Sequence, residues 1–163
     1  MKTRFDGLDV CAMVQHLQAH FLGAKVVNIY DAPSSSQNSN DTLAIKLDID
    51  NRRKEFLMIQ SGIRFHSMAA DRLDFAGTTP SPFCAKLRKH LRNARLAQVT
   101  QLGGPHERVV LLGFLGNSST TSLALVVELY SKGNILLLDA AQQYTILALW
   151  RSHVYDKKQN QKT

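Results

Sequence analysis

The chain has 163 residues, the size of one domain, and its 44% hydrophobic and 20% charged residues are typical of a globular protein. It has no run of eighteen apolar residues, and the opening MKTRFDGLDV lacks the apolar core of a secretory signal, so we expect neither a membrane span nor secretion. Two cysteines, Cys11 and Cys84, cannot build a disulfide framework and lack metal-site spacing. We therefore expect a cytoplasmic or nuclear protein with reduced thiols and no cofactor.

The positive charge is concentrated in one quarter of the chain. Residues 52–95 hold ten Lys/Arg and three Asp/Glu, which accounts for the whole net charge of +7. A concentrated basic block indicates an anionic partner, whereas uniform basicity would indicate only solubility.

The first half of the chain predicts one helix followed by an antiparallel sheet. Apolar residues at helical spacing predict a helix over residues 8–22, with Gly23 suited to the left-handed position after its end. Alternation of apolar and polar residues and short connections then predict strands, with a loop over residues 32–40. The expected strands cover residues 25–30, 42–49, 54–60 and 63–67.

The second half predicts another helix and a second β region. TTPSP at 78–82 interrupts the strand pattern, and a helix is expected over residues 82–95, capped by Ser81. Strands are expected over residues 99–102, 108–115, 123–130, 135–139 and 145–150, with hairpin loops at 117–121 and 132–134. This order predicts an α+β domain over residues 1–155, built as an antiparallel β-sandwich or flattened barrel with flanking helices. Residues 156–163 are expected to form a polar, frayed tail.

The second helix is the strongest candidate for binding. Its apolar residues fall on one face, and no acid interrupts residues 86–95. Such a cationic ridge suits binding to RNA phosphates. The alternative is an ordinary helix face exposed to solvent. No aromatic residue lies among the cations, so we do not expect them to stack on bases. Five phosphate contacts predict a log–log salt slope of about −3 to −4 with the single-strand coefficient. The expected phosphate-binding residues are Lys86, Arg88, Lys89, Arg92 and Arg95.

Three histidines and an arginine are weaker candidates. Arg64 and His66 share one face of a strand, and we expect them to lie beside the basic helix as further phosphate contacts; an ordinary polar sheet face is the alternative. His16 and His20 have the spacing of a zinc-protease helix, but Leu17 stands where that motif needs glutamate, so no metal site is expected. No motif for catalysis or for nucleotide binding is present, so we do not expect an enzyme.

Several blocks of the sequence, in order, resemble the amino-terminal domain of the NFACT family, most closely its eukaryotic branch. The resemblance covers residues 2–155, and its most specific blocks are PSPFCAKLRKHLRNARL and ELYSKGNILLLD. The other blocks are KTRFDGLDVCA, VVNIYD, SGIRFH, QLG…ERVV and ILALWRSH.

The resemblance implies a fold and a function. The family domain is similar in fold to the amino-terminal domain of formamidopyrimidine-DNA glycosylases. Family members are longer proteins of ribosome-associated quality control that bind large ribosomal subunits obstructed by peptidyl-tRNA. They help to recruit the listerin ubiquitin ligase, and they recruit tRNA to append alanine and threonine without mRNA. The expected partners are therefore the large subunit, ribosomal RNA and tRNA, with listerin reached through the full-length protein.

The resemblance also singles out residues for tailing. An acidic residue in the opening FDGLD motif of the family matches Asp9. An Asp-Arg pair before the ERVV-type strand matches Glu107 and Arg108, with Glu where the family usually has Asp. The preceding GGPH loop is also longer than the family pattern, so the resemblance predicts ribosome binding more directly than tailing.

Two alternatives stay open at this point. One is a glycosylase-like domain that binds or repairs DNA, although Lys2 and Thr3 stand where those enzymes need a proline nucleophile and a glutamate. The other is a protein-interaction module whose basic block meets an acidic partner. Preference for structured RNA over duplex DNA separates RNA binding from the first, and steep salt dependence of RNA affinity separates it from the second.

Overall fold

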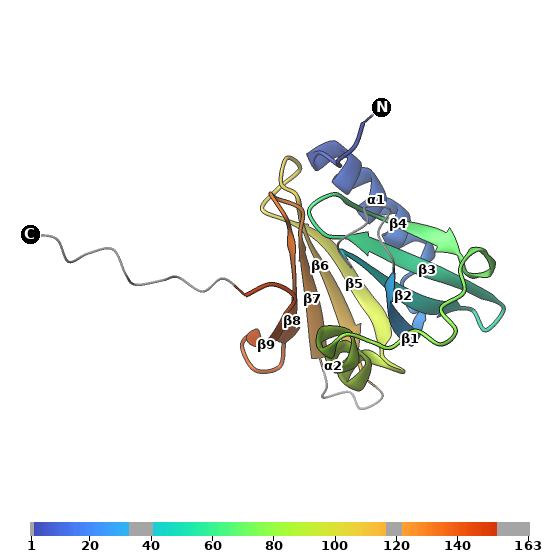
Figure 1. Ribbon diagram of the computed structural model, residues 1–163. Coiled ribbons are helices and arrows are strands. Elements are labelled where there is room, and N and C mark those ends of the chain that lie inside the picture. Colours follow the sequence, from blue (N-terminus) through green and yellow to red (C-terminus); the bar gives the residue numbers. More distant parts are fainter. Residues whose placement is uncertain (1, 33–40, 117–121, 153–163) are drawn as a thin grey trace, which may run out of the picture.

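The computed structural model describes residues 2–32, 41–116 and 122–152. Two α-helices, a short 3₁₀ turn and nine strands lie within these ranges (Figure 1). The elements are α1 (Gly7–His20), β1 (Lys25–Ala32), β2 (Thr42–Ile49), β3 (Arg53–Gln60), β4 (Arg64–Ala69), η1 (Ala70–Arg72), α2 (Pro82–Leu91), β5 (Arg95–Leu102), β6 (Val109–Leu115), β7 (Ser122–Glu128), β8 (Asn134–Asp139) and β9 (Thr145–Leu149).

All nine strands form one antiparallel sheet that bends between β1 and β5. The strand order is β4-β3-β2-β1-β5-β6-β7-β8-β9. Seven of the eight neighbouring pairs are joined over most of their length, whereas β1 and β5 share a single paired position, Lys25 with Arg95. Both strands carry a bulge just after this corner, at Val26–Asn28 and Leu96–Gln98, and bulges bend strands where a sheet turns. The sheet is therefore divided into two layers, β1–β4 and β5–β9.

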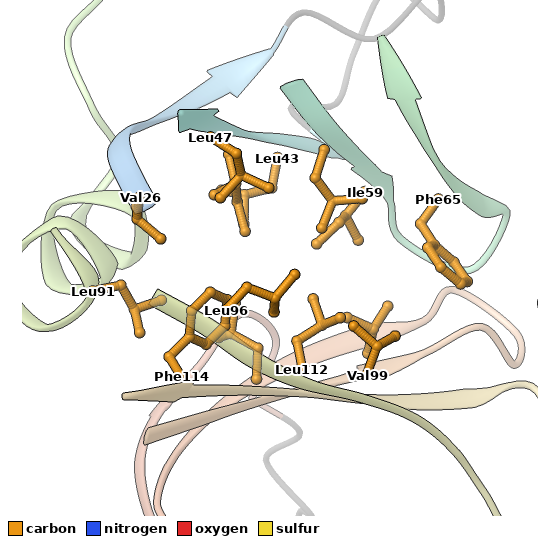
Figure 2. Packing of buried hydrophobic residues seen from close by; sticks show 14 of the residues in the cluster. Val26, Leu43, Leu47, Ile59, Phe65, Leu91, Leu96, Val99, Leu112 and Phe114 are labelled. Carbon is orange, nitrogen blue, oxygen red and sulfur yellow. The ribbon is translucent and has the colours of Figure 1, made fainter. Parts of the chain in front are cut away.

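The hydrophobic core lies between these two layers. Figure 2 shows Val26, Leu43 and Ile59 of one layer pointing toward Leu112 and Phe114 of the other. Both helices contribute a buried stripe to the same core, since α1 packs on β4 and β5 while α2 packs on β1 and β9. Each helix thus contacts one strand of each layer. The α+β class and the flattened antiparallel barrel with flanking helices, predicted from the sequence, are confirmed.

The prediction that the second helix continues to residue 95 is wrong. α2 ends at Leu91, Arg92 has the extended ψ of 135° typical of a helix exit, and Asn93 has a left-handed φ of 67°. Asparagine tolerates this conformation better than most residues, and the turn lets the backbone leave the helix for the sheet. The Asn93 N–H donates to the Val26 carbonyl (2.9 Å) and the Val26 N–H donates to the Ala94 carbonyl (2.8 Å). β5 therefore starts at Arg95, four residues before the predicted strand.

The other boundaries differ from the predictions by smaller amounts. α1 covers Gly7–His20 rather than residues 8–22, and β1 continues to Ala32. Three predicted segments lie outside the described residues: the loop at 32–40 apart from Ala32, the hairpin loop at 117–121 and the polar tail at 156–163. No helix within the described ranges is long and apolar enough to cross a membrane.

Candidate nucleic-acid interface

The start of α2 is fixed by an acid of β1. Ser81 caps the helix by accepting a hydrogen bond from the Cys84 N–H (3.2 Å), and Pro82 takes the first helical position. The Asp31 carboxylate accepts hydrogen bonds from the Ser81 N–H (2.6 Å) and from the Ser81 hydroxyl (2.9 Å). This negative charge already complements the positive end of the helix dipole. The helix N-terminus is therefore occupied, and anion binding by α2 must come from its side chains.

The buried stripe of α2 decides which of its cations face solvent. Cys84, Leu87 and Leu91 enter the core, and Lys86 and Lys89 face outward and are exposed. α2 carries no acidic residue, so neither lysine has an acidic partner along its own helix. The two lysines lie one turn apart and form the centre of the candidate interface.

Arg88 is turned toward β1 instead. Its Nε donates a 2.6 Å hydrogen bond to the Ile29 carbonyl, and its guanidinium lies 5.3 Å from the centre of the Tyr30 ring. The side chain is half-buried. Arg88 therefore fastens α2 to β1, and a substitution at this position would disturb the packing of the helix as well as the charge of the surface.

Arg92 and Arg95 follow the end of the helix rather than lying on it. The Arg92 Nε and Nη2 both donate to Asn28 Oδ1 (3.1 and 2.8 Å), and Arg95 Nη1 donates to the Gly23 carbonyl (2.9 Å). These neutral oxygens orient the two guanidinium groups without cancelling their charge. Both side chains are exposed, and together with the two lysines of α2 they form what we call the basic patch: Lys86, Lys89, Arg92 and Arg95.

His90 reports the unbalanced charge of this surface. The pKa of His90 is lowered from 6.5, first by partial burial and then by the positive charges of Lys89 and Lys86, with a smaller opposing effect of Asp139. The positive charges of the two lysines thus outweigh the negative charge of Asp139 at this side chain.

Arg64 and His66 do not lie beside α2, contrary to the prediction. They share the outward face of β4, opposite the core residue Phe65. β4 is an edge strand, separated from β1 by β3 and β2, and its helical neighbour is α1. Strand order is a tertiary property that the spacing of two side chains does not contain. Arg64 Nε donates to Gln60 Oε1 (3.2 Å), and His66 Nδ1 lies 3.2 Å from the Ser67 carbonyl oxygen.

The histidine pair of α1 also makes protein contacts. His16 Nε2 lies 3.2 Å from Ser67 Oγ, and the His16 ring packs against His20, with 4.9 Å between ring centroids. Among the described residues, no group of three or more His, Cys, Asp or Glu side chains is arranged to hold a metal ion.

Asp9 belongs to the capping box of α1. The Asp6 carboxylate accepts from the backbone N–H groups of Leu8 and Asp9 (2.9 and 3.0 Å), and the Asp9 carboxylate accepts in return from the Asp6 N–H (2.9 Å). Lys2 Nζ lies 2.6 Å from a carboxylate oxygen of each acid. The Lys2 ammonium, followed by the Asp9 N–H, lowers the pKa of Asp6 to about 2, and the hydrogen bonds to Asp6 and Asp9 raise the pKa of Lys2.

The β5–β6 loop packs on the start of α1, which brings Arg108 to the Asp9 segment (Figure 1). A Cβ at Gly7 would lie 2.6 Å from backbone atoms of His106, so only glycine permits this approach. Gln101 Nε2 donates to the carbonyls of both Gly7 (3.0 Å) and Glu107 (2.7 Å), and Arg108 Nη1 donates to the Phe5 carbonyl (3.5 Å). Two segments that the family resemblance singled out separately are therefore neighbours in space.

Sequence reasoning missed Tyr130, which holds the Glu107–Arg108 pair. The Tyr130 hydroxyl donates to Glu107 Oε2 and accepts from the Arg108 N–H (3.3 Å). The Arg108 guanidinium lies 4.6 Å from the centre of the Tyr130 ring. We call Glu107, Arg108 and Tyr130 the Tyr130 cluster. An aromatic residue near the start of the specific block ELYSKGNILLLD was the available signal, and Tyr130 is 42% exposed in the structure.

Comparison with known proteins gives consistent matches. The model of the NFACT N-terminal and middle domains matches residues 6–162. The chain is 36% identical over 151 residues to the human protein "Ribosome quality control complex subunit NEMF" and 34% identical over 163 residues to "Ribosome quality control complex subunit 2" of Schizosaccharomyces pombe. These matches cover 93% and 98% of the chain, but only 13% and 15% of the two relatives.

A solved structure has the same fold. The crystal structure of the N-terminal domain of fibronectin-binding protein PavA from Streptococcus pneumoniae superposes with a TM-score of 0.76 at 20% sequence identity. The superposition covers 96% of this chain and 59% of that one. At this identity the likeness concerns the fold alone.

Proposed function

The chain belongs to the family of the NFACT N-terminal and middle domains, as its sequence blocks predicted, and on that premise we propose that it is an RNA-binding domain of a ribosome quality control factor. In this proposal the domain recognises large ribosomal subunits that are obstructed by peptidyl-tRNA. The names of the relatives support a role in ribosome quality control. The activity of the whole factor is part of the proposal, since the chain spans about one seventh of the relatives' length.

The observation that carries the proposal is the basic patch. Lys86 and Lys89 are exposed and have no ion-pair partner among the described residues, while Arg92 and Arg95 are oriented only by neutral oxygens. Phosphates of an RNA backbone are the polyanion that several cations on one rigid surface bind best. The patch contacts backbone rather than base edges, which suits recognition of folded RNA by shape.

The Tyr130 cluster and Asp9 are proposed to position tRNA for alanine and threonine tailing. The Arg108 guanidinium lies over the Tyr130 ring, and the Arg108 backbone N–H donates to the Tyr130 hydroxyl, so the guanidinium is pre-oriented for a phosphate or a base edge. Glu107 offers a carboxylate beside it, although one of its oxygens is engaged by Tyr130. Recruitment of listerin through the full-length protein is part of the same proposal.

We further propose that the domain acts by binding and not by catalysis, in the cytoplasm or the nucleus. Its candidate residues are cations, acids and an aromatic ring, a set that suits recognition. Lys2 and Thr3 replace the proline and the glutamate that a glycosylase of similar fold would need, and Lys2 is engaged by Asp6 and Asp9.

Cosedimentation with large ribosomal subunits tests the proposal. The chain is mixed at moderate salt with subunits that carry peptidyl-tRNA and with vacant ones. Lys86→Glu/Lys89→Glu reverses the centre of the patch while sparing Arg88, whose loss would loosen α2. Arg52→Glu/Lys54→Glu is the matched control, because it reverses two exposed cations, Arg52 in the β2–β3 turn and Lys54 at the start of β3.

The expected result is preferential binding to obstructed subunits that the patch variant loses and the control keeps. Equal binding by all three proteins would refute the role of the patch, and no binding by the unsubstituted chain would refute the proposed function. Competition with duplex DNA that is stronger than with tRNA would instead favour a DNA-binding domain.

A further inference from the structure

A groove runs between the start of α2 and β9. It has a volume of about 470 Å³, within the range of small-ligand sites, and it is open to solvent on one side. Its walls come from two segments that are far apart in the sequence: residues 81–83 with Lys86 at the start of α2, and residues 148–150 at the end of β9. The residues that matter for its chemistry are Phe83, Lys86, Leu149 and Trp150.

One wall of the groove is aromatic and fixed in place. Phe83 and Trp150 stack with 5.6 Å between ring centroids and 25° between ring planes. The backbone N–H of Trp150 donates to the Ile135 carbonyl (2.9 Å), which ties the end of β9 to β8. Leu149 beside it is 41% exposed, so the apolar surface continues to solvent. Phe83 at the start of α2 and Trp150 after β9 thus place aromatic rings beside the cations of the helix, among which the sequence has none.

The groove joins this apolar wall to a cation. Lys86 lines the groove and is also a member of the basic patch. The Ser81 and Cys84 N–H groups at the start of α2 already donate to Asp31 and to the Ser81 hydroxyl, so the ammonium of Lys86 is the group proposed to receive a phosphate here. An aromatic wall beside an ammonium group matches a nucleobase attached to its phosphate.

We propose that the groove binds one unpaired nucleotide of an RNA strand, with the base against the Phe83–Trp150 pair and the phosphate at Lys86. This inference rests on the proposed RNA-binding function and names the part of the RNA that α2 contacts. Charge selects this occupant over an apolar peptide, because the patch continues from Lys86 to Lys89 without an acid on the helix. α2 also packs on β9, and a covered edge is poorly placed to accept an added peptide strand.

Trp150 is the only tryptophan of the sequence, so its fluorescence reports on this groove alone. The chain is titrated with a single-stranded hexanucleotide RNA and with a blunt duplex of the same sequence. The expected result is saturable quenching of Trp150 fluorescence by the single strand and little by the duplex, because only an unpaired base can stack in the groove. Equal quenching by the duplex, or binding of the single strand without quenching, would overturn the inference.

Substitutions give a second readout from the fluorescence anisotropy of the labelled single strand. Trp150→Ala should weaken binding about tenfold, within the usual worth of one stacked base, whereas Trp150→Phe should retain most of the affinity. Tyr144→Ala is the matched control, since Tyr144 is an aromatic residue that is 55% exposed and does not line the groove. Circular dichroism verifies that each variant is folded.

The outcomes separate this inference from the function on which it rests. If Trp150→Ala and Trp150→Phe bind RNA like the unsubstituted chain while Lys86→Ala/Lys89→Ala does not, the groove proposal fails and RNA binding stands. If the unsubstituted chain binds no RNA, both fail. Quenching by an acidic peptide but not by RNA would assign the groove to a protein partner and overturn the inference.

Discussion

The basic patch predicts a definite change in the salt dependence of RNA binding. Arg88 is committed to β1, which leaves four exposed cations: Lys86, Lys89, Arg92 and Arg95. With about 0.7 counterions released for each phosphate contact, four contacts give a log–log slope of about −2.8, shallower than the slope predicted from five. Lys86→Ala/Lys89→Ala removes two contacts and should bring the slope to about −1.4.

The assay is the fluorescence anisotropy of a labelled tRNA, titrated at five or more salt concentrations. The two proteins should differ most at low salt, and their affinities should converge as salt rises. Arg52→Ala/Lys54→Ala makes the same change in net charge at the β2–β3 turn and the start of β3, and it should keep the original slope. A patch variant with an unchanged slope would refute the reasoning. So would a control that flattens the slope equally, since that would show an effect of net charge alone.

Further predictions concern single groups. Burial is the main cause that raises the pKa of the Cys84 thiol to about 11, so at pH 8 iodoacetamide should label the half-buried Cys11 and spare Cys84 until the chain unfolds, as read by mass spectrometry. The lowered pKa of His90 means that the unfolded chain binds more protons near pH 6, so His90 makes the free energy of unfolding rise with pH up to about 6.5. Lys86→Ala/Lys89→Ala should raise the His90 pKa in an NMR titration, and no change would show that the lysines do not act on it. Gly7→Ala should lower the free energy of unfolding in urea by about 1–3 kcal/mol, because its Cβ would meet the His106 backbone; a neutral effect would contradict that packing. Tyr130→Phe keeps the ring under Arg108 but loses the contact to Glu107, so it should weaken tRNA binding several-fold without changing binding to vacant subunits, and an equal loss of both would indicate a merely structural role.

The sequence predicts local structure well wherever one face of an element is buried. The alternation in β2 and the apolar stripe of α2 both follow from the core between the two layers, and both were recognised. The end of α2 was not predicted correctly, because residues 92–95 continue the helical spacing of apolar and basic residues. Their conformation is decided by pairing of the Asn93–Ala94 backbone with Val26, a partner distant in the sequence.

The sequence predicted which charged residues form the candidate site, but not which residues from other elements lie beside them. The basic block located Lys86 and Lys89 without any structure, because exposed cations opposite an apolar stripe are a local property. Tyr130 and Trp150 join Arg108 and Phe83 only through the sheet, so no spacing in the sequence connects them. Strand order is likewise not contained in local spacing, so the position of Arg64 on the edge strand β4, away from α2, was not predicted.

The cations at the start of α1 and those at the end of α2 have different partners. This difference indicates which of the two surfaces binds a polyanion. At the start of α1, Lys2 is paired with two carboxylates, so its charge is balanced within the fold. At the end of α2, Arg92 and Arg95 are oriented by an amide oxygen and a backbone carbonyl, which fix their position and leave their charge in place. Cations that are oriented by neutral acceptors still attract an anionic partner. In the free protein the same cations repel one another. The phosphate backbone is therefore expected at α2, whereas Arg108, beside Glu107 and above Tyr130, is suited to discriminate between RNAs that the patch has already bound.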